Sequence, residues 1–189
     1  MTKTDIGILH LDCQDGNAEH IGDLMYKSLR SLIEISRIQQ RDLSDLRIRA
    51  GNSSWVNDFC TIKCGTSRRS GHSTSIARYI IDKNAKALVL SVSINSANII
   101  KESMVDRLWD TSIPFTLATN CIYSNNTSGF RVDFSSIDSF NKRLAINETY
   151  DIVFVDCASC VTADEKMRIQ MKVRDILPPD KSFHLVYME

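Results

Sequence analysis

The chain has 189 residues, of which 43% are hydrophobic and 24% are charged, so it is long enough and apolar enough to fold around its own core. Its 23 basic and 23 acidic side chains balance to a net charge of zero, which argues against a strongly basic nucleic-acid-binding protein. No apolar run approaches the ~20 residues of a membrane span, and the N-terminus lacks the pattern of a secretory signal peptide.

The first third of the chain has the pattern of helix. Apolar residues recur at helical spacing over 18–40, and residues 41–49 are compatible with a further helical turn. Gly51 and the three small polar residues after it predict a break. We therefore expect residues 1–54 to form an N-terminal helical extension that packs on the core. Contact with a partner protein is the minority interpretation of the apolar stripe.

From Trp55 onward, strand patterns alternate with helix patterns. In chain order we expect a strand over 55–64, a loop over 65–73, a short helix over 73–84, a buried strand over 86–93, a helix over 96–110, a strand over 129–136, a turn or short helix over 136–145, a buried strand over 150–159, a helix over 163–177 and a final strand over 182–189. This alternation predicts an α/β fold over 55–189, with a mostly parallel sheet flanked by helices on both faces. The strands at 60–64 and 152–156 should then end at the same edge of the sheet.

The loop between the first strand and the first short helix resembles a phosphate-binding loop. The usual pattern is G-x-x-x-x-G-K-[ST], and residues 66–73 read TSRRSGHS. Gly71 and Ser73 match this pattern. Thr66 replaces the first glycine, with Gly65 beside it, and His72 replaces the lysine.

An acidic residue ends the second buried strand. Asp156 closes the apolar run IVFVD, and an acid at the end of such a strand is suited to hold the water shell of Mg²⁺. Capping of the following turn is the alternative role for Asp156. Many ATPases have a glutamate next, which orients the attacking water, but here the next residue is Cys157.

These segments together resemble the ATPase domain of terminase large subunits, the DNA-packaging ATPases of tailed phages and herpesviruses. Their loops commonly read as serine, arginine, two further residues and then Gly-Lys-Ser/Thr, and Ser67, Arg68, Gly71 and Ser73 fall on that pattern. YDIVFVDCAS is similar to the family's apolar strand followed by Asp-Glu-Ala-Ser, and LVLSVSINSANIIKES is similar to the segment between the two motifs. The resemblance covers about residues 55–160.

The resemblance implies a P-loop NTPase core of the RecA and terminase type, with ATP and Mg²⁺ as cofactors. It implies double-stranded DNA and other subunits of a packaging complex as partners, no membrane, and a place in the cytoplasm or the host nucleus. Asp156 and Arg68 take catalytic roles by this resemblance, and Ser73 and Asp156 are the implied metal ligands. The implied cofactor-binding residues are Ser67, Arg68, Arg69, Ser70, Gly71, His72, Ser73 and Thr74.

Several of these residues also have an ordinary structural interpretation. His72 is shorter than lysine and mostly neutral at pH 7, so it either approaches a phosphate when protonated or is a polar loop residue. Arg68 and Arg69 either grip phosphate oxygens or are solvated loop charges. Ser73 either binds Mg²⁺ or caps the helix.

The replacement of lysine by His72 and of glutamate by Cys157 predicts a degenerate ATPase-type domain. Nucleotide binding is possible in this interpretation, but hydrolysis is weak or lost unless a partner supplies the missing groups. The alternative is a non-catalytic scaffold or regulatory protein that acts through protein–protein contacts. A nucleic-acid-binding module without nucleotide is a third possibility, supported by four arginines: Arg47, Arg49, Arg68 and Arg69.

Six cysteines are present, and in the absence of a secretory signal we expect them to be reduced thiols. Cys60 and Cys64 would point to one face of a strand by alternation, as core thiols. With Cys157 and Cys160 they give two close pairs, so a zinc site is the minority alternative. A redox role for Cys157 and Cys160 is weaker still, because the pair does not begin a helix.

Overall fold

The computed structural model describes residues 18–65, 71–126, 129–142, 148–176 and 182–189. Its helices are α1 (Ala18–Asp42), α2 (Ser44–Trp55), α3 (His72–Lys83), α4 (Ile94–Thr111), α5 (Ile137–Lys142) and α6 (Ala163–Val173). Its strands are β1 (Thr61–Cys64), β2 (Lys86–Ser91), β3 (Phe115–Leu117), β4 (Cys121–Ser124), β5 (Arg131–Ser136), β6 (Ile152–Val155) and β7 (His184–Met188). Short helical turns cover Val56–Cys60, Ala158–Cys160 and Arg174–Ile176.

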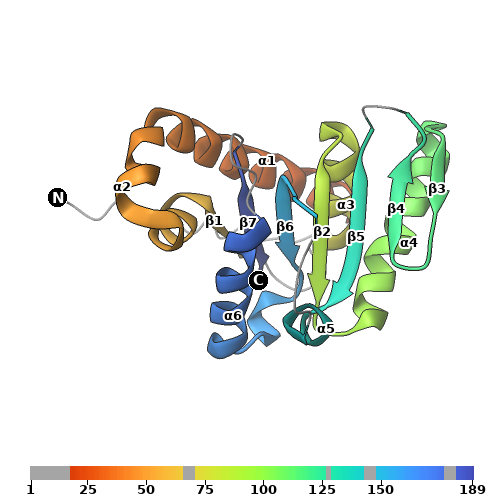
Figure 1. Cartoon of the computed structure of the whole chain (residues 1–189). Helices are drawn as coiled ribbons and strands as arrows, with labels where there is room; N and C mark the ends of the chain where they lie inside the picture. The colour runs from red at the N-terminus through yellow and green to blue at the C-terminus, as the bar shows by residue number, and fades with distance from the viewer. Residues whose placement is uncertain (1–17, 66–70, 127–128, 143–147, 177–181) are drawn as a thin grey trace.

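The strands form one mixed sheet in the order β1-β7-β6-β2-β5-β4-β3 (Figure 1). The first five strands are parallel, and the β3–β4 hairpin continues the sheet in antiparallel pairing. The long apolar runs predicted as buried strands, β2 and β6, lie side by side in the middle of the parallel part. The predicted α/β fold with a mostly parallel sheet is therefore confirmed.

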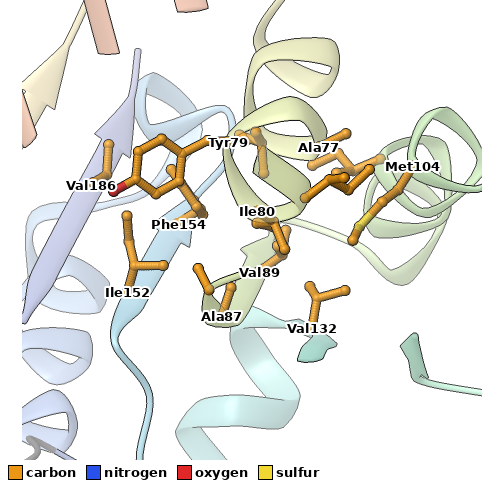
Figure 2. Close-up of a cluster of buried hydrophobic side chains, with 14 of the residues drawn as sticks. Ala77, Tyr79, Ile80, Ala87, Val89, Met104, Val132, Ile152, Phe154 and Val186 are labelled. Carbon is orange, nitrogen blue, oxygen red and sulfur yellow. The ribbon is translucent and has the colours of Figure 1, made fainter. Parts of the chain in front are cut away.

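Helices cover both faces of this sheet, and the alternation of side chains along each strand divides the core in two. One core packs beneath α1, α3 and α4 and includes Ala87, Val89, Ile152 and Phe154 (Figure 2). The other packs beneath α5 and α6 and includes Leu88, Leu90, Val153 and Val155. Each central strand is buried on both faces, as expected for parallel strands between helical layers.

Helix α1 belongs to the first of these two cores. Met25, Leu29 and Ile33 recur four residues apart, are at most 4% exposed, and pack on the same face as α3. Ser36 and Gln40 continue this buried stripe with polar side chains. The domain boundary expected between residues 54 and 55 stays a prediction, although α1 and the sheet share one core.

The segment before β1 differs from the prediction. A strand was expected from Trp55, but Val56–Cys60 forms a π-helical turn, and only Thr61–Cys64 is extended. The buried residues of this segment are Trp55, Val56 and Cys60, a spacing that fits a helical turn and does not alternate. The Trp55 and Phe59 rings lie 4.7 Å apart across this turn.

This turn also corrects the prediction for the cysteines. Cys60 lies in the core beneath α5 and α6, whereas Cys64 lies in the core beneath α1 and α3. The two side chains are therefore on opposite faces of the sheet, because Cys60 ends a helical turn and does not share the strand with Cys64. Both are buried as expected of core thiols, and burial raises the pKa of Cys60 to about 12 and that of Cys64 to about 11.

Two further features depart from the expected elements. The break expected at Gly51 is a kink, because Gly51 adopts φ 74° and ψ 157° inside α2. The β3–β4 hairpin was not predicted, since each of its strands is only three or four residues long. In the described part of the chain, no helix combines the length and apolarity of a membrane span.

Candidate nucleotide-binding site

The candidate site lies at the edge of the sheet where the parallel strands end. Strands β1, β7 and β6 are parallel neighbours, so Gly65 after β1 and Asp156 after β6 emerge at the same edge. This arrangement is the one predicted for the strands at 60–64 and 152–156. Strand β7 lies between them, and β2 lies on the other side of β6.

The loop itself is only partly described. Ser67, Arg68, Arg69 and Ser70 fall outside the described residues, so their predicted roles stay predictions. Gly71 has left-handed backbone with φ 79° and ψ 29°, and α3 begins at the next residue. The order strand, loop and helix is therefore the expected one. His72 and Ser73 are half-buried in the first turn of α3, and Thr74 is exposed there.

A close backbone contact holds the start of α3 against α1. A Cβ atom on Gly71 would lie 3.0 Å from the Cα of Gly22, so a larger residue does not fit there easily. The Ser75 hydroxyl donates a hydrogen bond of 3.4 Å to the Gly22 carbonyl, one turn further along α3. Helix α1 thus sets the position at which the loop enters α3.

His72 and Asp156 are electrostatically coupled across the edge. Burial lowers the pKa of His72, and the nearby Asp156 carboxylate partly offsets this by raising it. Burial raises the pKa of Asp156, while Cys157 and His72 act in the opposite direction. The fold therefore brings together the first turn of α3 and the end of β6, as the sequence predicted.

Asp156 is buried, with only 6% of its surface exposed. Its backbone N–H donates to the Leu90 carbonyl at 2.8 Å, which keeps the residue in register with β2. The Cys157 thiol donates to its carboxylate at 3.6 Å. Cys157 has a left-handed backbone, with φ 53°, and begins a tight turn closed by a 2.9 Å bond from the Cys160 N–H to the Cys157 carbonyl. The residue at the N-cap of the following turn, Ala158–Cys160, is Cys157, and no described side chain caps that turn.

Sequence reasoning missed two polar residues at this edge. Ser91 is the last residue of β2 and is fully buried. Glu189 follows β7, donates its N–H to the Cys64 carbonyl at 2.9 Å, and forms an ion pair of 3.2 Å with Lys166. In both cases the available signal was a polar residue at the end of an apolar strand. That signal was used to predict a site residue only for Asp156.

The remaining candidate residues are the arginines of α2 and the cysteines of the proposed zinc site. Arg47 and Arg49 belong to α2, which lies beyond the β1 end of the sheet (Figure 1). Within the described ranges, no group of three or more His, Cys, Asp or Glu side chains has the arrangement of a metal cluster. Zinc held by the two cysteine pairs together also conflicts with the placement of Cys60 and Cys64 on opposite faces of the sheet.

Comparison with known proteins gives a likeness in fold. No protein-family model and no curated protein matches this chain. The chain is similar in structure to phage large terminases. The large terminase of a thermophilic bacteriophage overlaps with a TM-score of 0.49 and 8% identity, over 72% of this chain and 37% of the terminase.

Two further structures show the same likeness. The terminase of that phage in complex with ADP gives a TM-score of 0.47 and 12% identity, over 72% of this chain and 36% of the terminase. The N-terminal domain of the DNA packaging ATPase from bacteriophage phi29 gives 0.45 and 8% identity, over 74% of this chain and 77% of that domain. The chain thus spans little more than a third of the large terminases that it resembles.

Proposed function

We propose that this chain is a P-loop-type nucleotide-binding domain that binds ATP with Mg²⁺ at the carboxyl edge of its sheet and hydrolyses it slowly on its own. The observation that carries this proposal is the placement of His72, at the start of α3, and Asp156, directly after β6, at the same edge of the sheet, although the two residues are far apart in sequence. A phosphate-binding loop and a metal-binding acid must meet in this way to act on one nucleotide.

The start of α3 supports phosphate binding. Unpaired backbone N–H groups and the positive end of the helix dipole favour an anion at a helix N-terminus. The left-handed Gly71 directly precedes α3, so the N–H groups of His72, Ser73 and Thr74 belong to the first turn of that helix. Gly71, His72, Ser73 and Thr74 are the described residues of this proposed cradle, and we propose Ser67, Arg68, Arg69 and Ser70 as its other members.

The residues at the edge fit a magnesium ion. Burial raises the pKa of Asp156, and the described groups that favour its charged form are the Cys157 thiol and backbone and the His72 ring. A divalent cation would stabilise that carboxylate in its charged form, and oxygen ligands such as Asp156 and Ser73 are those that Mg²⁺ prefers. When bound, Mg²⁺ would neutralise charge on the nucleotide phosphates.

Two features support slow hydrolysis. Burial lowers the pKa of His72, so this side chain is neutral at pH 7 and supplies no permanent charge to the phosphates. Cys157 stands where related ATPases have glutamate, and its thiol donates to Asp156. A group from a partner chain would be needed for fast turnover. We propose a packaging motor acting on double-stranded DNA as the setting, with its other subunits as partners.

A scaffold or regulatory role is the second candidate. Four large apolar side chains on α4 and β3 are exposed, namely Ile94 at 45%, Ile99 at 60%, Trp109 at 71% and Leu117 at 53%. Exposed apolar side chains of this size favour contact with another protein. This role would take first place if the chain bound no nucleotide.

Substitution of Asp156 by Asn tests the proposal. Titration calorimetry of the wild-type chain with Mg²⁺ and ATP should give saturable binding, and Asp156→Asn should weaken it by about 10-fold or more, because a charged ligand is lost. The unliganded variant should be more stable than wild type at neutral pH. Folding raises the pKa of Asp156, so the charged carboxylate destabilises the folded wild-type chain at neutral pH. Below about pH 4, the usual pKa of an unfolded aspartate, Asp156 is protonated in both states and this difference in stability should vanish.

Asp151→Asn is the matched control. Asp151 lies just before the same strand, at the opposite edge, and its carboxylate accepts a 3.0 Å hydrogen bond from the Lys86 backbone N–H. The control should bind the nucleotide like wild type. Absence of binding by the wild-type chain, or equal loss in both variants, would contradict the proposed site.

A further inference from the structure

Ser91 is a buried residue whose polar hydroxyl group is not paired within the described part of the chain. It is the last residue of β2, its exposed fraction is 0%, and its hydroxyl has no hydrogen-bond partner among the described residues. Buried hydroxyl groups are nearly always paired, because an unmade bond leaves the desolvation of the group uncompensated. This hydroxyl therefore calls for a specific explanation.

The other buried serines of the described chain have partners. Ser36 donates to the Phe59 carbonyl at 2.7 Å, Ser75 to the Gly22 carbonyl at 3.4 Å, and Ser135 to the Ser136 carbonyl at 3.1 Å. Ser91 is the exception among them. The missing partner of Ser91 is therefore not a general feature of the buried serines in this fold.

Ser91 lies beside Asp156 at the carboxyl edge. Leu90 of β2 pairs with Val155 of β6, and the Asp156 N–H donates to the Leu90 carbonyl at 2.8 Å, so Ser91 and Asp156 are neighbours directly beyond this pair. By alternation Ser91 follows Ala87 and Val89 on the face covered by α3, and Asp156 continues that face of β6. Neighbouring strands are about 5 Å apart, so the two side chains are adjacent on this face.

We infer that Ser91 is a further residue of the magnesium and nucleotide site, where its hydroxyl hydrogen-bonds to the hydrated Mg²⁺ beside Asp156. This inference rests on the proposed function. Bound Mg²⁺ keeps several of its waters, and such waters need acceptors in the protein. A serine oxygen next to the metal-binding acid meets this need, and the hydroxyl lacks a partner only until the ion binds.

The test compares Ser91→Ala with Ser135→Ala. Both positions are buried, on the adjacent strands β2 and β5, but the Ser135 hydroxyl is already paired with a backbone carbonyl. Calorimetry with ATP in the presence of Mg²⁺ should show about 10-fold weaker binding for Ser91→Ala and wild-type binding for Ser135→Ala. With EDTA in place of Mg²⁺, Ser91→Ala and wild type should bind ATP equally.

Thermal unfolding without ligand separates this role from a structural one. Ser91→Ala removes an unpaired hydroxyl, so its midpoint should be unchanged or higher by about 2–4 °C. Ser135→Ala loses a hydrogen bond, so its midpoint should fall. A lowered midpoint for Ser91→Ala would overturn the inference, because it would reveal a structural partner.

A double-mutant cycle completes the design. If Ser91 and Asp156 act on one hydrated ion, the losses in Mg²⁺-dependent affinity for Ser91→Ala and Asp156→Asn should not add. Wild-type affinity for Ser91→Ala in Mg²⁺ would overturn this inference while leaving the proposed function intact. Lack of Mg²⁺-dependent nucleotide binding by wild type would overturn both.

Discussion

His72 stands at the position that decides how a nucleotide would be held. It occupies the first residue of α3, where a lysine usually supplies a permanent charge to the phosphates. Burial lowers its pKa, and the neighbouring Asp156 does not outweigh that effect. The residue is therefore a neutral imidazole at pH 7, with less attraction for phosphate than lysine.

Replacement of His72 by lysine should restore the missing charge. Affinity for ATP with Mg²⁺ should rise by about 10- to 150-fold, because one charge-assisted contact is worth roughly 1.5–3 kcal/mol. Calorimetry would measure this change. Asn95→Lys adds the same charge to the exposed first turn of α4 at the same sheet edge, and should raise the affinity far less.

A second substitution tests the proposed role of position 157. Cys157→Glu, added to His72→Lys, should raise the rate of ATP hydrolysis more than it raises affinity, because this group acts on the attacking water. Phosphate release under saturating ATP would measure the rate. A large gain in affinity without a gain in rate would contradict the assigned role of position 157.

At the scale of elements, the junction between α1 and α3 positions the loop. The Cα of Gly22 lies 3.0 Å from the place where a Gly71 side chain would begin, and Gly71 has left-handed backbone. Two conditions thus require glycine at position 71. The interaction between α1 and α3 continues through the ion pair of Arg78 with Asp23 and through Arg78 over the Tyr26 ring, 4.2 Å from its centre.

Gly71→Ala should therefore destabilise the protein. A left-handed conformation costs a residue with a side chain about 1–2 kcal/mol, and the contact with Gly22 adds to this. Urea unfolding would measure the loss. Gly65→Ala, at the other end of the loop, should have little effect, because a Cβ atom there would meet nothing within 4 Å.

At the scale of the whole molecule, buried polar groups connect α1 to the edge of the sheet that lies opposite the candidate site. Gln40 of α1 donates to the Phe183 carbonyl at 2.7 Å and accepts from the Phe183 N–H at 3.1 Å. The His184 Nδ1 atom lies 3.2 Å from the Ser36 Oγ atom. These contacts join residues at the two ends of the described chain, so they form only when the whole fold is assembled.

This connection predicts a loss of stability in acid. Burial lowers the pKa of His184 to about 4, with a further contribution from Arg37. Because the unfolded chain takes up the proton near pH 6.5, the contribution of His184 is fully present above that pH. It should fall by about 3 kcal/mol as the pH drops toward 4.

Urea unfolding at a series of pH values would measure this effect, with His184→Asn as the reference that lacks the titrating group. The difference in unfolding free energy between wild type and His184→Asn should shrink as the pH falls from 7 to 4. A constant difference would show that His184 does not bind a proton differently in the folded and unfolded chains.

Much of the fold could be predicted from the sequence, because its signals are local. The apolar runs of β2 and β6 and the helical spacing of α1, α4 and α6 reflect burial on two faces or on one stripe. Val56–Cys60 was predicted wrongly, because the segment was joined to the strand that follows it, although its apolar residues do not alternate. The β3–β4 hairpin was not predicted because its strands are short. It joins the sheet through the pairing of β4 with β5.

The sequence by itself determined that Asp156 ends a buried strand and that a glycine-containing loop precedes a helix, since both depend on neighbours along the chain. The tertiary structure alone decided which strands are neighbours, and so which residues face one another at the edge. Ser91 and Asp156 are far apart in the sequence, but the parallel pairing of β2 with β6 makes them neighbours. The close contact between Gly22 and Gly71, and the burial that keeps His72 neutral, depend in the same way on packing between distant segments.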